Sequence, residues 1–164
     1  MNHDIFPCLW CDNNAAEVAA YYAATLQAKT VNSNPVVVNI DVAGQKIMLL
    51  NGGPKFIKNP SVSLMLICNS AAELQQYWDA LAQEGVPLMP LDAYPFADRY
   101  GWIRDKYGMT WQLYFKEGYT AEQRITPTLM FINANNGKAK EAIELYTSIF
   151  PASEIEGIMY YKDG

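Results

Sequence analysis

Residues 13–22, NNAAEVAAYY, and residues 69–78, NSAAELQQYW, repeat one pattern of small, acidic and aromatic side chains. Each segment places a side chain suited to N-capping, Asn14 or Ser70, three residues before a glutamate, which is the spacing of a capping box. Apolar residues then follow at the spacing of one helix face. The two segments therefore predict helices that begin alike, and such repetition indicates a fold built from copies of one unit.

Each predicted helix follows an apolar strand and precedes a hairpin. The apolar strands are residues 6–11 and 62–68. The hairpin turns, DVAG at 41–44 and DKYG at 105–108, have Asp in the first place and Gly in the fourth, as in a type I turn. Both halves thus predict the order strand, helix, strands and hairpin.

The second half is longer than the first because of residues 86–98. This segment contains Pro87, Pro90 and Pro95. Because proline lacks a backbone N–H and has a fixed φ, the segment predicts irregular structure.

A third copy of the unit begins near Ile125. Residues 127–129, PTL, resemble residues 7–9, PCL, and a helix follows before Pro151. A further strand is predicted over 154–161. The chain is therefore divided into residues 1–118 with two complete units, a linker at 119–124, and residues 125–164 as the start of a second, incomplete domain. Either the protein is a truncated two-domain protein or a partner chain completes the sheet, and an incomplete sheet edge favours association, here as a homodimer.

Composition narrows the class of protein. The formal charge is −5, which gives no basic field for nucleic acid. No apolar stretch approaches the roughly 20 residues of a membrane span, and the N-terminal residues do not have the pattern of a signal peptide. The three cysteines form no secreted disulfide framework, so a cytoplasmic protein is expected.

Several stretches together resemble a known family. They are FPCLW at 6–10, the helix around Glu17, LNGGPKF at 50–56 and GWIRDKYGMTWQL at 101–113. The chain resembles the PhnB-like branch of the vicinal oxygen chelate superfamily, whose other branches include glyoxalase I, bleomycin-resistance proteins and extradiol dioxygenases. The resemblance covers about residues 5–116. It implies an α+β fold in which paired β-α-β-β-β modules form a half-open, curled sheet barrel around a cavity.

In the metal enzymes of that superfamily, four ligands project into the cavity. Carried over, the ligand positions fall at Phe6 or Pro7, within 47–51, near Ser63 and near Gln112, where relatives have a glutamate. None of these residues is a strong ligand for a first-row metal. We therefore expect no metal and no other cofactor.

Members of the branch often carry the label 3-demethylubiquinone-9 3-methyltransferase. The chain has no G-x-G stretch of the kind that lets backbone N–H groups approach S-adenosylmethionine, so the label is interpreted as a family name. No nucleophile–base pair identifies catalytic residues. The sequence favours metal-free binding of a small aromatic or anionic molecule. The alternatives are a metal-dependent lyase, isomerase or dioxygenase, and an oligomerisation module without catalysis.

Strand alternation predicts which side chains face the cavity. If Leu9 and Cys11 face the helices, Cys8 and Trp10 face the cavity, so the C-x-x-C of this strand forms neither a redox pair nor a zinc site, and core cysteines are expected. The predicted ligand-binding residues are Trp10, Ser63, Met65, Trp102, Arg104, Gln112 and Tyr114. Such an apolar, aromatic cup with a few polar tips is typical of small-molecule sites, although the same residues could simply fill the barrel as core. Arg104 could clamp an anion or pair with Asp98 or Asp105.

The glycine pair at Gly52 and Gly53 follows a predicted strand and precedes a proline and a lysine. A phosphate-binding loop needs a helix N-terminus directly after it, and none is predicted here. The pair is therefore predicted to form a bend between the two modules.

Overall fold

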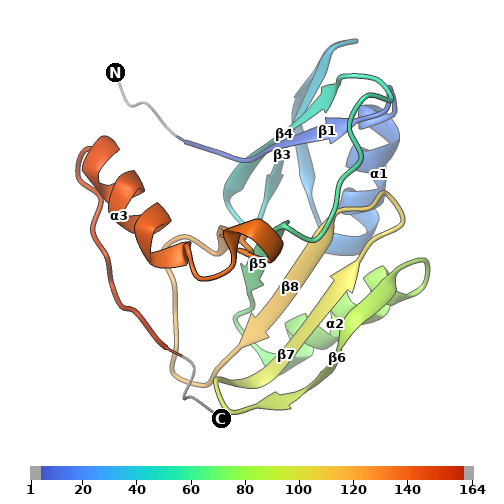
Figure 1. Ribbon diagram of the computed structural model, residues 1–164. Helices are drawn as coiled ribbons and strands as arrows, with labels where there is room; N and C mark the ends of the chain where they lie inside the picture. Colours follow the sequence, from blue (N-terminus) through green and yellow to red (C-terminus); the bar gives the residue numbers. More distant parts are fainter. Residues whose placement is uncertain (1–4, 161–164) are drawn as a thin grey trace. The chain divides into compact units, whose positions relative to one another are not determined.

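The computed structural model describes residues 5–160, which divide into two compact units at Thr128 and Leu129. The first unit is α+β: two curled sheets that do not close into a barrel, each with one helix packed on one face (Figure 1). No helix within residues 5–160 is long and apolar enough to cross a membrane.

The first module has one helix and a four-stranded sheet. Its elements are β1 (Cys8–Cys11), α1 (Ala15–Leu26), β2 (Lys29–Ser33), β3 (Val37–Val42) and β4 (Gln45–Asn51). The strand order is β1-β4-β3-β2, with β1 parallel to β4 and the other pairs antiparallel. Gly44 donates its N–H to Asp41 Oδ1 at 3.0 Å, so the predicted hairpin is confirmed. The predicted type I turn is wrong, because Val42 pairs with Gln45 and the two loop residues, Ala43 and Gly44, both have positive φ (51° and 84°), as in a type I′ turn.

The second module repeats this arrangement. Its elements are β5 (Val62–Ile67), α2 (Ala71–Ala82), β6 (Val86–Tyr94), β7 (Ala97–Arg104) and β8 (Thr110–Phe115). The strand order is β6-β7-β8-β5-β9, with β5 parallel to β8 as β1 is to β4. The additional strand β9 (Ile125–Leu129) comes from the predicted third copy. The two predicted β-α-β-β-β modules are thus confirmed.

The prediction of irregular structure over 86–98 is wrong, because β6 and β7 form a long hairpin there. β6 lies at the edge of its sheet, where proline is tolerated because one side of the strand needs no partner. The pairing of β6 with β7 shifts register between Pro87 and Met89, between Met89 and Asp92, and again before Tyr94. These irregularities accommodate Pro87 and Pro90 within the strand.

The core lies between the helices and one face of each sheet. Alternate strand residues, such as Leu9 and Cys11 in β1 and Leu64 and Leu66 in β5, are buried there together with helix residues such as Tyr22 and Leu74. The period-two pattern predicted this side of the strands correctly. The opposite faces of the two sheets have no helix of the first unit against them.

The two repeated helices begin differently. Ser70 Oγ accepts the N–H of Glu73 at 3.1 Å, so the predicted cap of α2 is confirmed. Asn14 makes no side-chain cap, which contradicts the prediction for α1. The N–H of Ala15 instead donates to Asn51 Oδ1, at 2.8 Å, from the end of β4. An amide from a distant strand therefore replaces the local cap.

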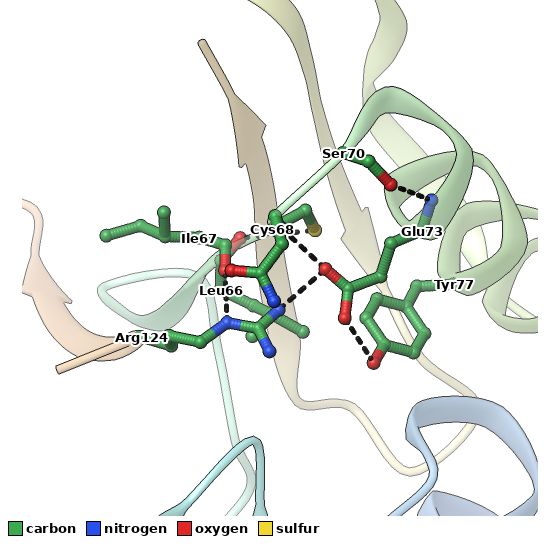
Figure 2. Close-up of polar contacts among 8 residues, drawn as sticks. Leu66, Ile67, Cys68, Ser70, Glu73, Tyr77 and Arg124 are labelled. Carbon is green, nitrogen blue, oxygen red and sulfur yellow. Dashed lines mark hydrogen bonds and ion pairs between the residues drawn. The ribbon is translucent and has the colours of Figure 1, made fainter. Parts of the chain in front are cut away.

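Arg124 attaches the start of β9 to the second module (Figure 2). Its Nε donates to the carbonyl of Ile67 at 2.8 Å, and its Nη2 lies 2.8 Å from Glu73 Oε2. Glu73 also accepts from the Tyr77 hydroxyl at 3.1 Å. Burial opposes the ionisation of Glu73, but the hydrogen bonds and the charge of Arg124 outweigh it and lower its pKa. The neighbouring Ile125 is fully buried.

The glycine pair forms a bend, as predicted. The N–H groups of Gly52 and Gly53 both donate to the carbonyl of Cys11, at 3.0 and 3.2 Å. A Cβ on Gly52 would lie 2.2 Å from the ring of Trp10, and Gly53 has φ of 81°. No helix follows before β5, so the stretch connects the modules and does not form a phosphate-binding loop.

The second unit contains a 3-10 helix, η1 (Asn133–Asn135), and the predicted helix α3 (Ala139–Ile149). The strand predicted over 154–161 is not found: residues 154–160 form no strand, and Tyr161 lies outside the described residues. A strand needs a hydrogen-bonded neighbour, and this segment pairs with none among residues 5–160. No side chain from 126 to 160 is buried.

Candidate functional site

The face of the second sheet that points away from α2 contains most of the predicted ligand-binding residues. On each strand, the residues of this face alternate with core residues such as Leu66, Ile103 and Leu113. The predicted residues on this face are Ser63 and Met65 in β5, Trp102 and Arg104 in β7, and Gln112 and Tyr114 in β8. We refer to this surface as the cavity face, because it lies on the side of the sheet where the family resemblance implies a cavity.

The strand register arranges these side chains in rows across the sheet. The middle row is Met65, Gln112 and Trp102, paired in that order across β5, β8 and β7. One row toward the start of β5, Ser63, Thr110 and Arg104 pair in the same way. Trp102 and Met65 are half-buried and Arg104 is exposed. The face thus presents an aromatic and thioether row beside a row that ends in a guanidinium.

A chain of hydrogen bonds crosses the middle of the cavity face. The Tyr100 hydroxyl donates to Gln112 Oε1 at 2.8 Å, and Gln112 Nε2 donates to Ser63 Oγ at 2.6 Å. Gln112 is 8% exposed and Ser63 2% exposed. Burial, with a smaller contribution from Tyr94, raises the pKa of Tyr100 to about 12, so the phenol keeps its proton at neutral pH. The chain holds the Gln112 amide in one orientation.

Trp102 and Arg104 retain unused polar groups. Trp102 Nε1 is shielded from solvent and has no hydrogen-bond partner among residues 5–160. Arg104 forms no ion pair within the same part of the chain. The two acids considered as its partners are engaged elsewhere: Asp98 accepts the N–H of Glu117, and Asp105 is buried in a separate cluster. The guanidinium of Arg104 is therefore available to an anion.

Trp10, the remaining predicted residue, lies in the first sheet. Its Nε1 donates to the carbonyl of Gly53 at 2.7 Å, and its ring packs edge-on against Phe56. It lines a cavity of about 250 Å³ with Cys8, Lys58 and other residues of the connection between the modules. The indole N–H of Trp10 is thus used by this connection, and Trp10 takes no part in the hydrogen-bonded chain on the cavity face.

Tyr100 was missed as a site residue from sequence. It precedes Trp102 by two positions and Arg104 by four, so strand alternation places it on the same face. The prolines of 86–98 predict irregular structure up to Asp98, which hides the start of the strand that contains Tyr100. Recognising that β7 begins at Ala97 would have found it.

The donor set on the cavity face does not suit a transition metal. Gln112 and Ser63, which the resemblance implied as positions near two metal ligands, do come together, since their side chains are hydrogen-bonded. Both are neutral, and both polar atoms of the Gln112 amide are already used. Within residues 5–160, no three His, Cys, Asp or Glu side chains gather as a metal-binding group. Neutral amide and hydroxyl oxygens are weak ligands for first-row metals.

The three cysteines differ in burial. Cys11 and Cys68 are buried, as expected of core cysteines, and burial raises the pKa of Cys68 to about 12. Cys8 is exposed, so the expectation that it belongs to the core is wrong. Its position opposite to Leu9 and Cys11 on the pleat explains the difference.

Asp105 forms a second polar cluster, on the core side of the sheets. It makes the predicted turn, accepting the N–H of Tyr107 and of Met109, at 2.9 and 3.0 Å. It also accepts from the Tyr22 hydroxyl at 2.7 Å and from Trp111 Nε1 at 3.2 Å. Burial raises the pKa of this carboxyl group despite these hydrogen bonds. Asp105 therefore joins α1 of the first module to the sheet of the second.

Comparison with known proteins agrees with this architecture. The model of the 3-demethylubiquinone-9 3-methyltransferase family matches residues 3–114. A PhnB protein from Bacillus cereus, which carries the same methyltransferase description, is 29% identical, with a TM-score of 0.62. The match covers 69% of this chain and 99% of that protein. No curated protein matches the sequence.

More distant structures share the fold alone. A glyoxalase-related enzyme from Fulvimarina pelagi is 18% identical, with a TM-score of 0.57 over 77% of this chain and 98% of its own. A lactoylglutathione lyase from Agrobacterium tumefaciens is 17% identical, with a TM-score of 0.52 over 73% and 100%. These folds are consistent with the vicinal oxygen chelate superfamily. Since the family model spans most of the chain, the protein belongs to the PhnB-like 3-demethylubiquinone-9 3-methyltransferase family.

Proposed function

We propose that this protein binds a small, partly aromatic or anionic molecule on the cavity face of its second sheet, without using a metal. The observation that carries the proposal is the chain from Tyr100 through Gln112 to Ser63. Its polar groups are buried on a sheet face that has no helix of the first unit against it. A pre-ordered polar group beside half-buried aromatic side chains is the usual composition of a small-molecule site.

The side chains around this chain supply apolar contact area. Met65 and Trp102 flank Gln112 in the register, and Tyr114 pairs with Tyr100 in the next row. Aromatic side chains bury large areas and contribute most of the affinity in many binding sites. Because the polar chain is already ordered, a ligand would lose little free energy in arranging it.

The name of the family does not establish the function of this chain. The lyase and glyoxalase-related enzymes share only its fold. Gln112 and Ser63 occupy two of the superfamily's ligand positions with neutral groups, which favours binding over metal-assisted chemistry. A near-stoichiometric transition metal in protein purified without a chelator would contradict the metal-free proposal and favour a lyase, isomerase or dioxygenase instead.

Tryptophan fluorescence and thermal denaturation test the binding itself. The purified chain is titrated with a panel of aromatic acids, aromatic alcohols and aliphatic acids, and its melting temperature and emission are recorded. Binding on the cavity face should raise the melting temperature and perturb the emission of Trp102. No response across the whole panel would contradict the proposal.

Two tryptophan variants locate the site. Trp102→Phe removes an indole from the cavity face. Trp78→Phe makes the same change on α2, where Trp78 packs over Gly101 on the opposite face of the sheet. The first variant should weaken binding and remove most of the fluorescence change, whereas the second should preserve the affinity. Equal effects of the two variants would place the ligand elsewhere.

A further inference from the structure

We infer that the ligand is an aromatic carboxylate, with its anionic end at Arg104 and its ring over Met65 and Trp102. This inference rests on the proposed function and specifies its ligand. It depends on three features of the cavity face: an uncompensated cation, a hydroxyl proton at the end of the hydrogen-bonded chain, and an apolar row beside both.

The cation is Arg104. Within residues 5–160 it has no carboxylate partner, and both acids close to it in sequence are engaged by other groups. The chain as a whole carries a formal charge of −5, so an anion meets net repulsion over most of the surface. A planar guanidinium offers paired N–H donors that match a carboxylate.

The hydroxyl proton belongs to Ser63. Each donor of the hydrogen-bonded chain points from Tyr100 toward Ser63, so Ser63 Oγ accepts from Gln112 and retains its own O–H. Ser63 Oγ donates no hydrogen bond within residues 5–160, where its one side-chain hydrogen bond is the one that it accepts from Gln112. Ser63 and Arg104 lie in the same row, separated only by Thr110 on β8. One row therefore holds donors near both of its ends and no acid.

The next row is apolar at its two flanking positions. Met65 and Trp102 lie on either side of Gln112. This row lies two residues after the Ser63–Arg104 row along β5 and β8, and two residues before it along the antiparallel strand β7. Successive residues of one strand face are about 7 Å apart along the strand. A ring over this row can therefore reach the Ser63–Arg104 row through a short spacer. This geometry favours arylalkanoates over acids whose carboxylate is attached directly to the ring.

Matched ligands and matched variants test the inference. The probes are 3-phenylpropionate, its uncharged counterpart 3-phenylpropanol, and benzoate, titrated into the full chain. Arg104→Gln removes the proposed anion contact. Lys116→Gln makes the same charge change at an exposed position just after β8 and serves as the control. We expect 3-phenylpropionate to bind about tenfold more tightly than the alcohol, and Arg104→Gln to remove about that factor.

The outcomes separate this inference from the proposed function. If the acid and the alcohol bind equally and Arg104→Gln changes neither, the site exists but does not select a carboxylate, and the inference is wrong. If neither compound binds and the wider panel also changes neither the melting temperature nor the tryptophan emission, the proposed function is wrong. If Lys116→Gln weakens the acid as much as Arg104→Gln does, the effect is one of net charge and the inference also fails. Tighter binding of benzoate than of 3-phenylpropionate would contradict the spacing argument.

Discussion

The helices α2 and α3 begin from similar sequence but end in different environments. Both follow a strand, and both are amphipathic, with a glutamate in the first turn. In α2, Leu74, Tyr77 and Leu81 are buried in the core. No residue of α3 is buried, and Leu145 remains 54% exposed. The difference shows that an amphipathic pattern specifies the helix, whereas the sheet that follows it supplies the burial.

The first unit shows that an amphipathic helix becomes buried when a sheet forms beside it. After α2, strands β6, β7 and β8 return to pair with one another and with β5, and the helix packs on the face they form. After α3, residues 154–160 form no strand, so the part of the second unit that the structure describes, residues 129–160, has no sheet of its own. Large apolar side chains on α3, such as Leu145 and Ile149, are left exposed. The comparison therefore predicts very different stability effects for equivalent changes in the two helices.

Truncating a leucine in each helix should give the largest contrast. Leu74→Ala removes a fully buried side chain and should lower the free energy of unfolding by about 2–5 kcal/mol, because a cavity forms in the core. Leu145→Ala changes an exposed position and should alter it by less than about 0.5 kcal/mol. Urea denaturation followed by circular dichroism measures both. Comparable losses in the two variants would mean that α3 is covered by another surface, for example in a dimer.

Two truncations measure how much the third copy contributes to the stability of the first unit. A chain ending at Met130 keeps β9, whereas a chain ending at Gly118 loses the buried Ile125 and the contact of Arg124 with Glu73. The longer variant should unfold with nearly the free energy of the full chain. The shorter one should lose about 2–3 kcal/mol, chiefly from burial of the Ile125 side chain. The Bacillus cereus relative, which aligns over 99% of its own length, shows that this fold does not require a third module.

The same truncations test the expected homodimer. If residues 131–164 mediate association, light scattering should show a dimer of the full chain and monomers of both variants. Dimers of both variants would contradict association through the third module. Equal stability of the two variants would contradict the structural contribution of Ile125 and Arg124.

Asp105 is buried in the first unit, and its effect on stability should depend on pH. Its raised pKa means that the folded protein holds its proton more strongly than the unfolded chain does, whose value is about 3.8. Its stabilising contribution is therefore fully present below pH 3.8 and is lost as the pH rises through the folded-state pKa. Glu73 acts in the opposite direction: its pKa is lowered, so its contribution is lost as the pH falls through that pKa.

Asp105→Asn isolates this effect. The Asn amide can still accept from the backbone but places an N–H near Trp111 Nε1, which loses its acceptor. At low pH the variant should be about 1–3 kcal/mol less stable than the wild type. The gap should narrow as the pH rises, since only the wild type loses the contribution of a protonated Asp105. Denaturation at a series of pH values measures the gap, and a gap that widens with pH would contradict the sign.

Repetition and strand alternation were the parts of the fold most readable from sequence. They predicted both modules, the helix-facing core and the side of the strand on which Trp102, Arg104 and Gln112 lie. The edge strand β6 was missed, because proline content says nothing about whether a strand has a neighbour on both sides. The burial of Asp105 was missed for a related reason: the local pattern of a turn is the same whether its carboxylate meets water or Tyr22.

The caps of α1 and α2 provide the smallest contrast. Ser70→Ala removes a side-chain cap and should destabilise the protein by about 1 kcal/mol. Asn14→Ala removes no such bond and should cost much less, although Asn14 occupies the same place in the repeat. Asn51→Ala should have an effect like that of Ser70→Ala, because its amide holds both the N–H of Ala15 and the carbonyl of Pro35. Denaturation of the three variants measures the ranking. If Asn14→Ala were the most costly, the local cap predicted from the repeat would be the real one, and the two modules would begin their helices in the same way.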